Sequence, residues 1–219
     1  MRAEFNGNGE TNMEDEYFKI FDEDRNEIGI ASRNDVHRLG YWHETFHCWF
    51  VTKHKGKDYI YLQLRSDTKQ DYPNLFDITA AGHLTSDEKV QDGVREVKEE
   101  LGIDVLFNDL VPLGIMEYCT IKENFIDKEF AHVFLYKSEH SLDEFILQTE
   151  EVSGMVLAEF KDFSDLWFGE KETIKIKGFE LNKEGKRMMI DKYIGKDQFA
   201  PHQPSFYLGV IQKIEEEIY

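Results

Sequence analysis

The sequence predicts an α/β protein, because stretches with strand character alternate with amphipathic helices along its 219 residues. Residues 46–52, 59–65 and 128–136 are rich in aromatic and β-branched side chains, which suit the pleated surface of a sheet. From about Glu88 to Leu101, and again from Ser205 to the C-terminus, apolar side chains recur three and four positions apart, as on one face of a helix. With 41% hydrophobic residues, the chain is able to bury a substantial core around such a sheet.

Shorter elements complete this expectation. An N-terminal hairpin is expected at residues 17–20 and 27–31. Three further strands are expected at residues 76–80, 111–120 and 155–160. Residues 171–203 mix basic and acidic side chains without a clear period, and we expect them to be irregular. We expect a single domain over residues 13–219, with the hairpin as an N-terminal extension and a C-terminal helix. Residues 1–12 are polar and rich in Gly and Asn, as in a flexible leader or a cloning remnant.

The helix expected from about Glu88 carries three carboxylates on one face. Glu96, Glu99 and Glu100 stand at i, i+3 and i+4, so they lie within one turn of each other. Like charges at this spacing destabilise a helix by about 0.2–0.5 kcal/mol per pair. A divalent cation such as Mg²⁺, which takes carboxylate and phosphate oxygens as ligands, compensates this repulsion. The apolar stripe on another face is formed by Val90, Val94, Val97 and Leu101.

The stretch from Gly82 to Ile103, GHLTSDEKVQDGVREVKEELGI, resembles the Nudix box. Its second half, REVKEELGI, matches the REUxEExGU pattern in which U is apolar, and Gly82 and Glu88 supply the G-x5-E half. Six residues, where the pattern has seven, separate Glu88 from Arg95, so the departure concerns the loop before the helix. In the Nudix family the box is a loop–helix–loop that holds a divalent metal against a diphosphate. The resemblance implies a Nudix fold, in which a mixed β-sheet is sandwiched between α-helices (α/β/α).

The resemblance also implies roles for the residues of the box. The implied ligand set for Mg²⁺ or Mn²⁺ is Glu96, Glu100, Glu99 and Gly82, the last through its backbone carbonyl. Glu99 also belongs to the implied catalytic set, together with Arg95, which is expected to point off the metal face and to pair with Glu88. Glu88 thereby structures the loop. A capping box of Thr85 and Glu88, with Gly102 as the left-handed cap at the other end, explains Glu88 equally well.

A further Glu outside the box often completes a Nudix site or acts as its base. Glu129 is our candidate for a catalytic role, because it leads an otherwise apolar face of the strand at residues 128–136. Glu150 or Glu151, which precede Val152, is the alternative.

The flanks of the box resemble one branch of the family. HETFHCWF and YPNLFDITAAGH are similar to Nudix hydrolases that are related to isopentenyl-diphosphate isomerase, and this resemblance covers roughly residues 15–160. The isomerase has a catalytic Cys in a C-G-H-P motif, where this chain has Ala81 followed by Gly82 and His83. Residues that match other isomerase ligands are His37, His43, Asp127 and Glu129. Our candidates for contacts with the substrate are His43, His83 and Arg65.

The sequence therefore predicts a divalent-metal-dependent hydrolase that cleaves the pyrophosphate bond of a nucleoside-diphosphate-linked or related small molecule. The first alternative is isopentenyl-diphosphate isomerase, which Ala81 disfavours unless Cys48 replaces the missing thiol. The second is a catalytically silent, nucleotide-sensing Nudix module. Such a module would usually have lost carboxylates of the box, which this chain retains.

Composition limits the partners and the location. The formal net charge of −18 argues against nucleic acid polymers and anionic membrane surfaces, both of which bind through Lys and Arg. Two cysteines without metal-ligand spacing, and no apolar run of about 18 residues, indicate a cytoplasmic protein. Nudix enzymes are often dimers, so the resemblance also allows a homodimer.

Overall fold

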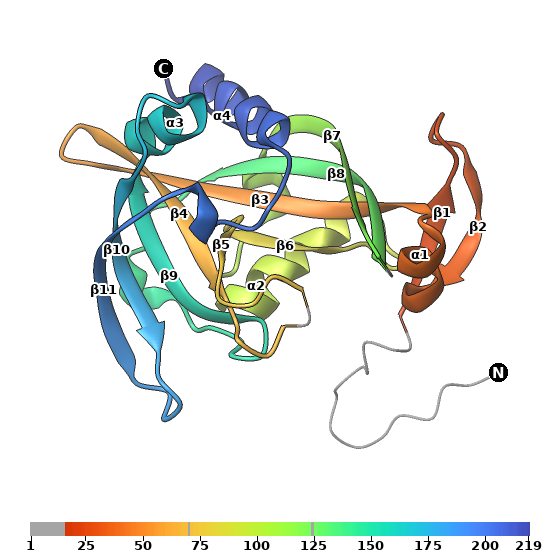
Figure 1. Cartoon of the computed structure of the whole chain (residues 1–219), viewed down its shortest axis with the longest axis horizontal. Helices are drawn as coiled ribbons and strands as arrows, with labels where there is room; N and C mark the ends of the chain where they lie inside the picture. Colours follow the sequence, from red (N-terminus) through yellow and green to blue (C-terminus); the bar gives the residue numbers. More distant parts are fainter. Residues whose placement is uncertain (1–15, 70, 124) are drawn as a thin grey trace.

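A single mixed sheet of 11 strands runs through the computed structural model, which describes residues 16–69, 71–123 and 125–219 (Figure 1). The strands are β1 (Tyr17–Phe21), β2 (Glu27–Ser32), β3 (Trp42–His54), β4 (Lys57–Arg65), β5 (Phe76–Asp77), β6 (Ala80–His83), β7 (Val111–Lys122), β8 (Phe125–Lys137), β9 (Val152–Glu159), β10 (Ile174–Leu181) and β11 (Arg187–Ile194). The α-helices of the described residues are α1 (Arg33–Leu39), α2 (Arg95–Leu101), α3 (Phe160–Phe168) and α4 (Pro204–Ile218). The leader expected at residues 1–12 lies outside the described residues.

The long strand β3 is the centre of the sheet. It runs parallel to β8, from the pair Trp42–Lys128 to the pair Val51–Lys137, and antiparallel to β4 and β6. The main path of neighbouring strands is β11-β10-β9-β4-β3-β1-β2, and β7 pairs with β8 beside it. The combination of parallel and antiparallel pairs confirms the predicted mixed sheet.

Alternation along β3 divides the core into two layers. Trp49 and Val51 face the apolar cluster that includes α3 and α4, whereas Phe46 and Phe50 face the cluster that includes Val97 of α2. Figure 1 shows α3 and α4 on one side of the sheet and α2 on the other. The predicted sandwich of helices around a sheet is therefore confirmed, and it fixes α2 against the strands that carry the candidate site.

The helix of the box begins later than predicted. A 3₁₀ helix, Val90–Val94, follows the loop after Glu88, and α2 begins only after it. Gly93 packs tightly there, because a Cβ atom on it would lie 2.6 Å from Cβ of Phe46. At the other end Gly102 has φ = 70° and caps α2 in the left-handed conformation, as predicted.

The prediction that residues 171–203 are irregular is wrong. β10 and β11 form an antiparallel hairpin that extends the sheet beyond β9. Ile174 and Ile176 are buried, and they alternate with Lys175 and Lys177 on the other face. This is a strand period of two, in which the lysines resemble mixed surface charge. β11 exposes most of its side chains, so its own alternation is weak.

The N-terminal extension consists of the predicted hairpin β1–β2 followed by α1, which was not predicted. Ser32 caps α1 by accepting a hydrogen bond from the backbone N–H of Asp35 at 3.3 Å, and Gly40 ends it at φ = 70°. α1 is short and brings His37 beside the sheet. Among the described helices, none is long and apolar enough to span a membrane.

Candidate functional site

The carboxylates of Glu96 and Glu100 of α2 lie beside β6. Glu100 is buried and accepts a hydrogen bond from the backbone N–H of Ala81 at 3.2 Å. Glu96 approaches the backbone so closely that a Cβ atom on Gly82 would be 2.0 Å from Glu96 Cδ. A side chain at this position would displace the Glu96 carboxylate, which gives a physical reason for Gly as the first residue of the box.

Burial makes negative charge costly at both carboxylates. It is the main reason that the pKa of Glu96 is raised to about 7, although Arg95 opposes the shift. Burial first, and the charge of Glu96 second, raise the pKa of Glu100 well above its usual value. A cation between the two groups stabilises both as anions. Carboxylate oxygens are the ligands that Mg²⁺ and Mn²⁺ prefer, so the residues present fit the implied metal.

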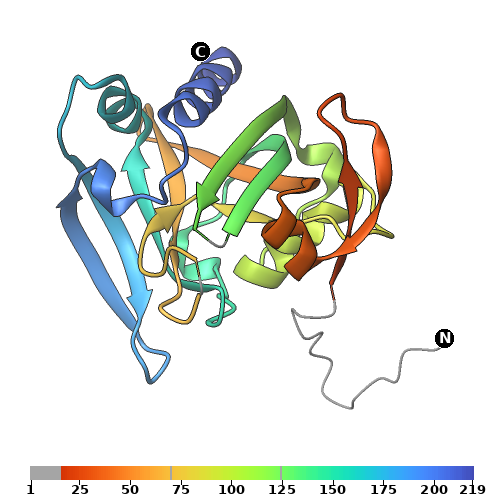
Figure 2. The ribbon, with the colours of Figure 1, turned by 45° about the vertical axis from the view of Figure 1, so that its right-hand side comes forward.

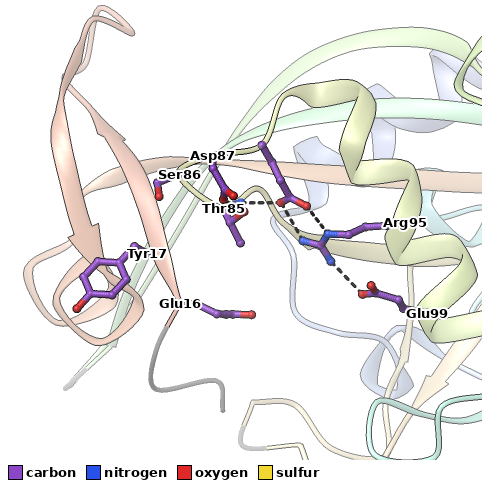
Figure 3. A pocket seen from close by; sticks show the side chains of 8 residues that line it. Glu16, Tyr17, Thr85, Ser86, Asp87, Arg95 and Glu99 are labelled. Atoms are coloured by element: carbon purple, nitrogen blue, oxygen red, sulfur yellow. Dashed lines mark hydrogen bonds and ion pairs between the residues drawn. The ribbon is translucent and has the colours of Figure 1, made fainter. Parts of the chain in front are cut away.

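Arg95 joins the loop before α2 to the carboxylates of the helix (Figure 3). Its Nε and Nη2 atoms donate to the two oxygens of Glu88, as the family resemblance implies. Its Nη1 atom also donates to Glu96 at 2.7 Å and to Glu99 at 3.0 Å. The expectation that Arg95 points off the metal face is therefore wrong. The guanidinium holds three acidic side chains together and partly neutralises them.

Glu88 structures the loop and does not start the helix. Besides its ion pair with Arg95, its carboxylate accepts a hydrogen bond from the backbone N–H of Thr85 at 2.8 Å. The T-x-x-E contact thus forms within the loop, ahead of the 3₁₀ helix. The two roles considered for Glu88 are combined in one side chain.

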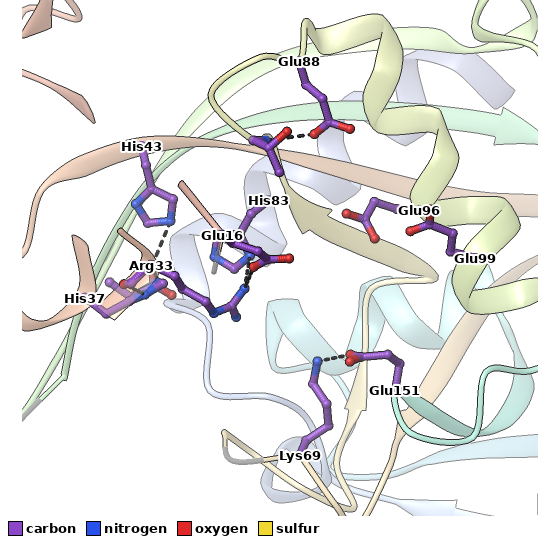
Figure 4. A network of polar contacts seen from close by, with 12 residues as sticks. Glu16, Arg33, His37, His43, Lys69, His83, Glu88, Glu96, Glu99 and Glu151 are labelled. Atoms are coloured by element: carbon purple, nitrogen blue, oxygen red, sulfur yellow. Dashed lines mark hydrogen bonds and ion pairs between the residues drawn. The ribbon is translucent and has the colours of Figure 1, made fainter. Parts of the chain in front are cut away.

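The carboxylate that approaches the box from outside is Glu151, and not Glu129. The charge of Glu151 raises the pKa of Glu100, and that of Lys69 lowers it, so both groups lie near the box. Lys69 forms an ion pair with Glu151 (Figure 4). Lys69 was not predicted, because a single Lys in the polar loop after β4 carries no periodic signal.

Glu129 lies on the strand face that also carries the apolar residues packed toward α4. It accepts a hydrogen bond from Thr45 Oγ1 at 3.1 Å, and its oxygen lies 3.3 Å from Nε2 of His47. Burial alone would raise the pKa of Glu129, but the hydrogen bond and charge of His47 bring it below its usual value. Glu129 is therefore held as an anion in a region rich in imidazole groups.

Three histidines from three different elements converge beside Glu129: His37 of α1, His43 of β3 and His83 of β6. One ring nitrogen of each lies within 4.8 Å of the others, and the same holds for His43 with oxygens of Asp127 and Glu129. The structure thus brings together all the residues that match the isomerase ligands. We call these five residues the imidazole cluster.

The geometry of the imidazole cluster would allow it to hold a metal ion. Nε2 of His43, Nε2 of His83 and Oδ1 of Asp127 are buried without a hydrogen-bond partner among the described residues. Burial lowers the pKa of His43 to about 4, so its ring is neutral at physiological pH, as a metal ligand requires. Its Nδ1–H donates to the carbonyl of Tyr41 at 3.2 Å, which leaves Nε2 for a metal. Mixed imidazole and carboxylate donors suit transition metals such as Mn²⁺ or Zn²⁺.

Phe18 of β1 covers two rings of the imidazole cluster. It stacks on His83 with ring centroids 4.8 Å apart and on His43 with centroids 5.5 Å apart. His43 and His83 were our candidates for contacts with the substrate. His43 is buried and His83 is half-buried, and the stacking of Phe18 on both rings favours metal ligation over substrate contact.

The side chain of Arg65 binds neighbouring residues of the protein in place of the expected contact with the substrate. Its guanidinium donates to Asp77 Oδ2 at 2.9 Å, to the carbonyl of Asp71 at 2.8 Å and to that of Tyr72 at 3.1 Å. These contacts fix the turn at residues 71–72. They also occupy the guanidinium N–H groups with which Arg65 would bind a phosphate. His202 also donates to Asp77, at 2.8 Å, and ties the segment before α4 to the same carboxylate.

The thiol of Cys48 does not replace the one that Ala81 lacks. Ala81 is paired with His47 on β3, and Cys48 follows His47, so its side chain points to the opposite face of the sheet. There Cys48 is fully buried next to Phe46 and Phe50, and burial raises its pKa far above the usual range. It packs as a small apolar residue.

A family model for the NUDIX domain matches residues 41–178, which span β3, the box and Glu129. The chain belongs to the Nudix family. This Nudix protein is 40% identical over 210 residues to an uncharacterized Nudix hydrolase of Clostridium acetobutylicum, and the match covers 94% of the chain and 100% of that relative. It is also 29% identical to isopentenyl-diphosphate Delta-isomerase 2 of Photorhabdus laumondii, over 64% of the chain and 75% of the isomerase.

The Nudix fold is confirmed by a solved structure. A crystal structure of a MutT/nudix family protein from Enterococcus faecalis superposes with a TM-score of 0.51 at 14% identity, over 79% of this Nudix chain and 62% of that one. The elements outside the matched residues 41–178 are the hairpin β1–β2 with α1 at one end, and β11 with α4 at the other.

Proposed function

We propose that this Nudix protein is a divalent-metal-dependent hydrolase that cleaves the phosphoanhydride bond of a nucleoside-diphosphate-linked small molecule. The observation that carries the proposal is the pair of Glu96, which is partly buried, and Glu100, which is buried; both lie beside β6 and have raised pKa values. A divalent cation bound at this pair would stabilise both carboxylates as anions. Membership of a family whose named relatives include hydrolases supports the same assignment.

Each residue of the box has a part in this activity. Glu96 and Glu100 would hold Mg²⁺ or Mn²⁺, and Gly82 keeps the backbone beside them open. A bound divalent ion supplies electrostatic stabilisation of the phosphate oxygens and lowers the pKa of a coordinated water. Arg95 keeps Glu96 and Glu99 in place through hydrogen bonds of 2.7 and 3.0 Å.

We assign the general base to Glu151 in preference to Glu129. A base must first be near the reacting water, and Glu151 is the carboxylate outside the box whose charge acts on Glu100. Lys69 orients Glu151 through their ion pair. Glu129 is engaged by Thr45 and His47 and belongs to the imidazole cluster. Glu99 assists at the rim, where its side chain is 54% exposed.

Isomerisation is the second candidate, and the imidazole cluster together with the isomerase relative favours it. The reaction moves a proton onto one carbon and removes one from another, so it needs an acid and a base on the substrate. A methyl group stands at Ala81, and Cys48 lies on the opposite face of the sheet. A silent sensor is disfavoured because the carboxylates of the box are retained and brought together.

A substrate screen with two readouts tests the proposal. The full chain is incubated with Mg²⁺ and nucleoside diphosphate derivatives, dinucleoside polyphosphates or prenyl diphosphates, and release of phosphate or AMP is measured. Isopentenyl diphosphate is incubated in deuterated water in parallel, and deuterium incorporation is measured. We expect cleavage of at least one nucleotide anhydride and no deuterium incorporation. Deuterium incorporation without anhydride cleavage would overturn the proposal.

A further inference from the structure

The sheet ends in an edge strand that a further strand can extend. β11 is the last strand of the main path, and in the described part of the chain no residue pairs with its outer edge. Figures 1 and 2 show it as the outermost strand, at the end of the sheet opposite to the hairpin β1–β2. The backbone N–H and C=O groups along an uncovered edge are a template for another strand.

β11 is the more regular of the two end strands. It pairs with β10 from Arg187 to Ile194 without a shift in register. At the other end of the sheet β2 is shorter, and its pairing with β1 shifts between Ile20 and Phe21. A bulge twists an edge strand away from a further partner, so β2 has a protection that β11 lacks.

Large apolar side chains on β11 face solvent. Met188, Met189 and Tyr193 are 50%, 83% and 67% exposed. Because successive side chains of a strand point to opposite faces, these three are distributed over both faces of the sheet. A strand that pairs with β11 would therefore cover apolar surface on each face, in addition to the free backbone groups.

We propose that β11 pairs with β11 of a second copy of this chain, so that one sheet runs through a symmetric dimer. A two-fold axis perpendicular to the sheet makes the two strands antiparallel and leaves each face of the sheet continuous. β11 lies outside the family match at residues 41–178, so this interface is not part of the matched domain. The pairing does not depend on the proposed hydrolase function.

The charges of β11 favour an identical strand as its partner. Charged side chains usually keep edge strands apart, and β11 carries Arg187, Asp191 and Lys192. In an antiparallel pair centred on Ile190, each of these charged residues lies opposite an uncharged one. The opposed pairs are Ile190 with Ile190, Met189 with Asp191, Met188 with Lys192 and Arg187 with Tyr193. Over residues 187–193, β11 is therefore complementary to itself.

Other registers of comparable length place like charges opposite each other, which destabilises a strand pair. A pair centred on Asp191 or on Lys192 would have two identical charges at its axis. A pair centred on Met189 would have Lys186 opposite Lys192. The charges therefore select the register that is centred on Ile190.

Opposite charges also meet beyond the ends of the paired strands. The turn before β11 carries Lys183 and Glu184, the segment after β11 carries Lys196 and Asp197, and all four residues are exposed. In the register centred on Ile190, Glu184 of one copy approaches Lys196 of the other, and Lys183 approaches Asp197. Such complementarity fixes the orientation of two partners and their register.

Analytical ultracentrifugation of the full chain in Mg²⁺, from about 1 to 200 µM, tests the proposal. Because one strand pair buries less surface than a standard interface of about 1,600 Å², we expect a reversible dimer whose mass approaches that of two chains as the concentration rises. Met188→Lys should raise the dissociation constant at least tenfold, because the new charge lies opposite Lys192. Lys192→Glu added to Met188→Lys should restore association, which shows that the single variant had not simply unfolded.

Met189→Lys is the matched control, because its new charge lies opposite Asp191 and should not weaken the dimer. Ile28→Lys on β2, at the other end of the sheet, should also leave association unchanged. The mass of a single chain at every concentration overturns the inference and leaves the hydrolase proposal standing. A dimer that survives Met188→Lys and dissociates in Met189→Lys or in Ile28→Lys overturns it as well, because another register or the other edge would then form the interface.

Discussion

Gly82 and Glu96 are in direct contact, since a Cβ atom on Gly82 would lie 2.0 Å from Cδ and 2.1 Å from Oε1 of Glu96. Gly82→Ala must therefore push this carboxylate away from β6. A shift of about 1 Å in a positioned catalytic group lowers turnover by about 100-fold, and we expect a loss of this size. Steady-state hydrolysis of the best substrate measures it. Gly209→Ala is the control, because its added Cβ would have only ordinary contacts at 3.9 Å with Met116.

Mg²⁺ should raise the thermal stability of the protein, because it binds the folded state and offsets the repulsion between Glu96 and Glu100. A ligand at 100 times its dissociation constant stabilises the folded state by about 2.7 kcal/mol. Melting curves in millimolar Mg²⁺ and in EDTA give the shift. In the double variant with Glu96→Gln and Glu100→Gln the shift should disappear. An identical melting temperature of the wild type in both buffers would count against the metal site.

Glu151→Gln should lower kcat by about 10²–10⁴-fold, which is the usual contribution of general acid–base catalysis. The amide keeps the shape of the side chain and cannot accept the proton. Glu150→Gln is the matched control, because Glu150 is its exposed neighbour and should retain nearly full activity. If Glu129→Gln lost activity to this extent and Glu151→Gln did not, the base would belong to the imidazole cluster.

Asp77 should make the protein more stable at neutral pH than in acid. Burial alone would raise its pKa, but the charge and hydrogen bond of His202, together with the charge of Arg65, lower it below the usual value. A carboxyl group with a lowered folded-state pKa stabilises the fold above its unfolded pKa of about 3.9, and this contribution is lost as the pH falls through the folded pKa. Asp77→Asn should therefore destabilise the protein at pH 7, by roughly 3–5 kcal/mol for a broken buried pair, and by about 1 kcal/mol less at pH 3, where the loss of this contribution has only begun. Urea unfolding at both pH values measures the difference.

The box and the main strands follow from local sequence patterns. Val97 and Leu101 are spaced as one helix face, and both are buried in the layer between α2 and the sheet. Gly82 and Glu96 are distant in sequence, so only the folded chain brings them into contact. The family pattern nevertheless identifies both as parts of one box. Residues 174–181 were missed because lysines interrupt the apolar positions, although their period is that of a strand.

The sequence does not predict which side chains from other loops lie beside the box. Lys69 and Glu151 are 82 residues apart and meet only because the loop after β4 lies beside the turn before β9. From the sequence alone, Arg65 resembles a ligand for phosphate. Its actual acceptors include a backbone carbonyl in the turn at residues 71–72, and the sequence does not predict the conformation of this turn. Side chains that belong to irregular segments lack a period, so their contacts require the structure. The homodimer and the cytoplasmic location stay predictions.

The central claim is that Glu96 and Glu100 hold the metal that drives hydrolysis, and turnover of Glu100→Gln tests it most directly. The substitution keeps the shape of the side chain and removes one charged ligand. Because Glu100 faces β6 and not the apolar stripe of Val97 and Leu101, we expect the variant to fold normally. On the best substrate of the screen, kcat of Glu100→Gln should fall by at least 1,000-fold, with an unchanged circular dichroism spectrum and a melting temperature in EDTA that is not lowered, because the substitution also removes the repulsion with Glu96. Near-wild-type hydrolysis by both Glu100→Gln and Glu96→Gln would contradict the assignment of the box as the active site.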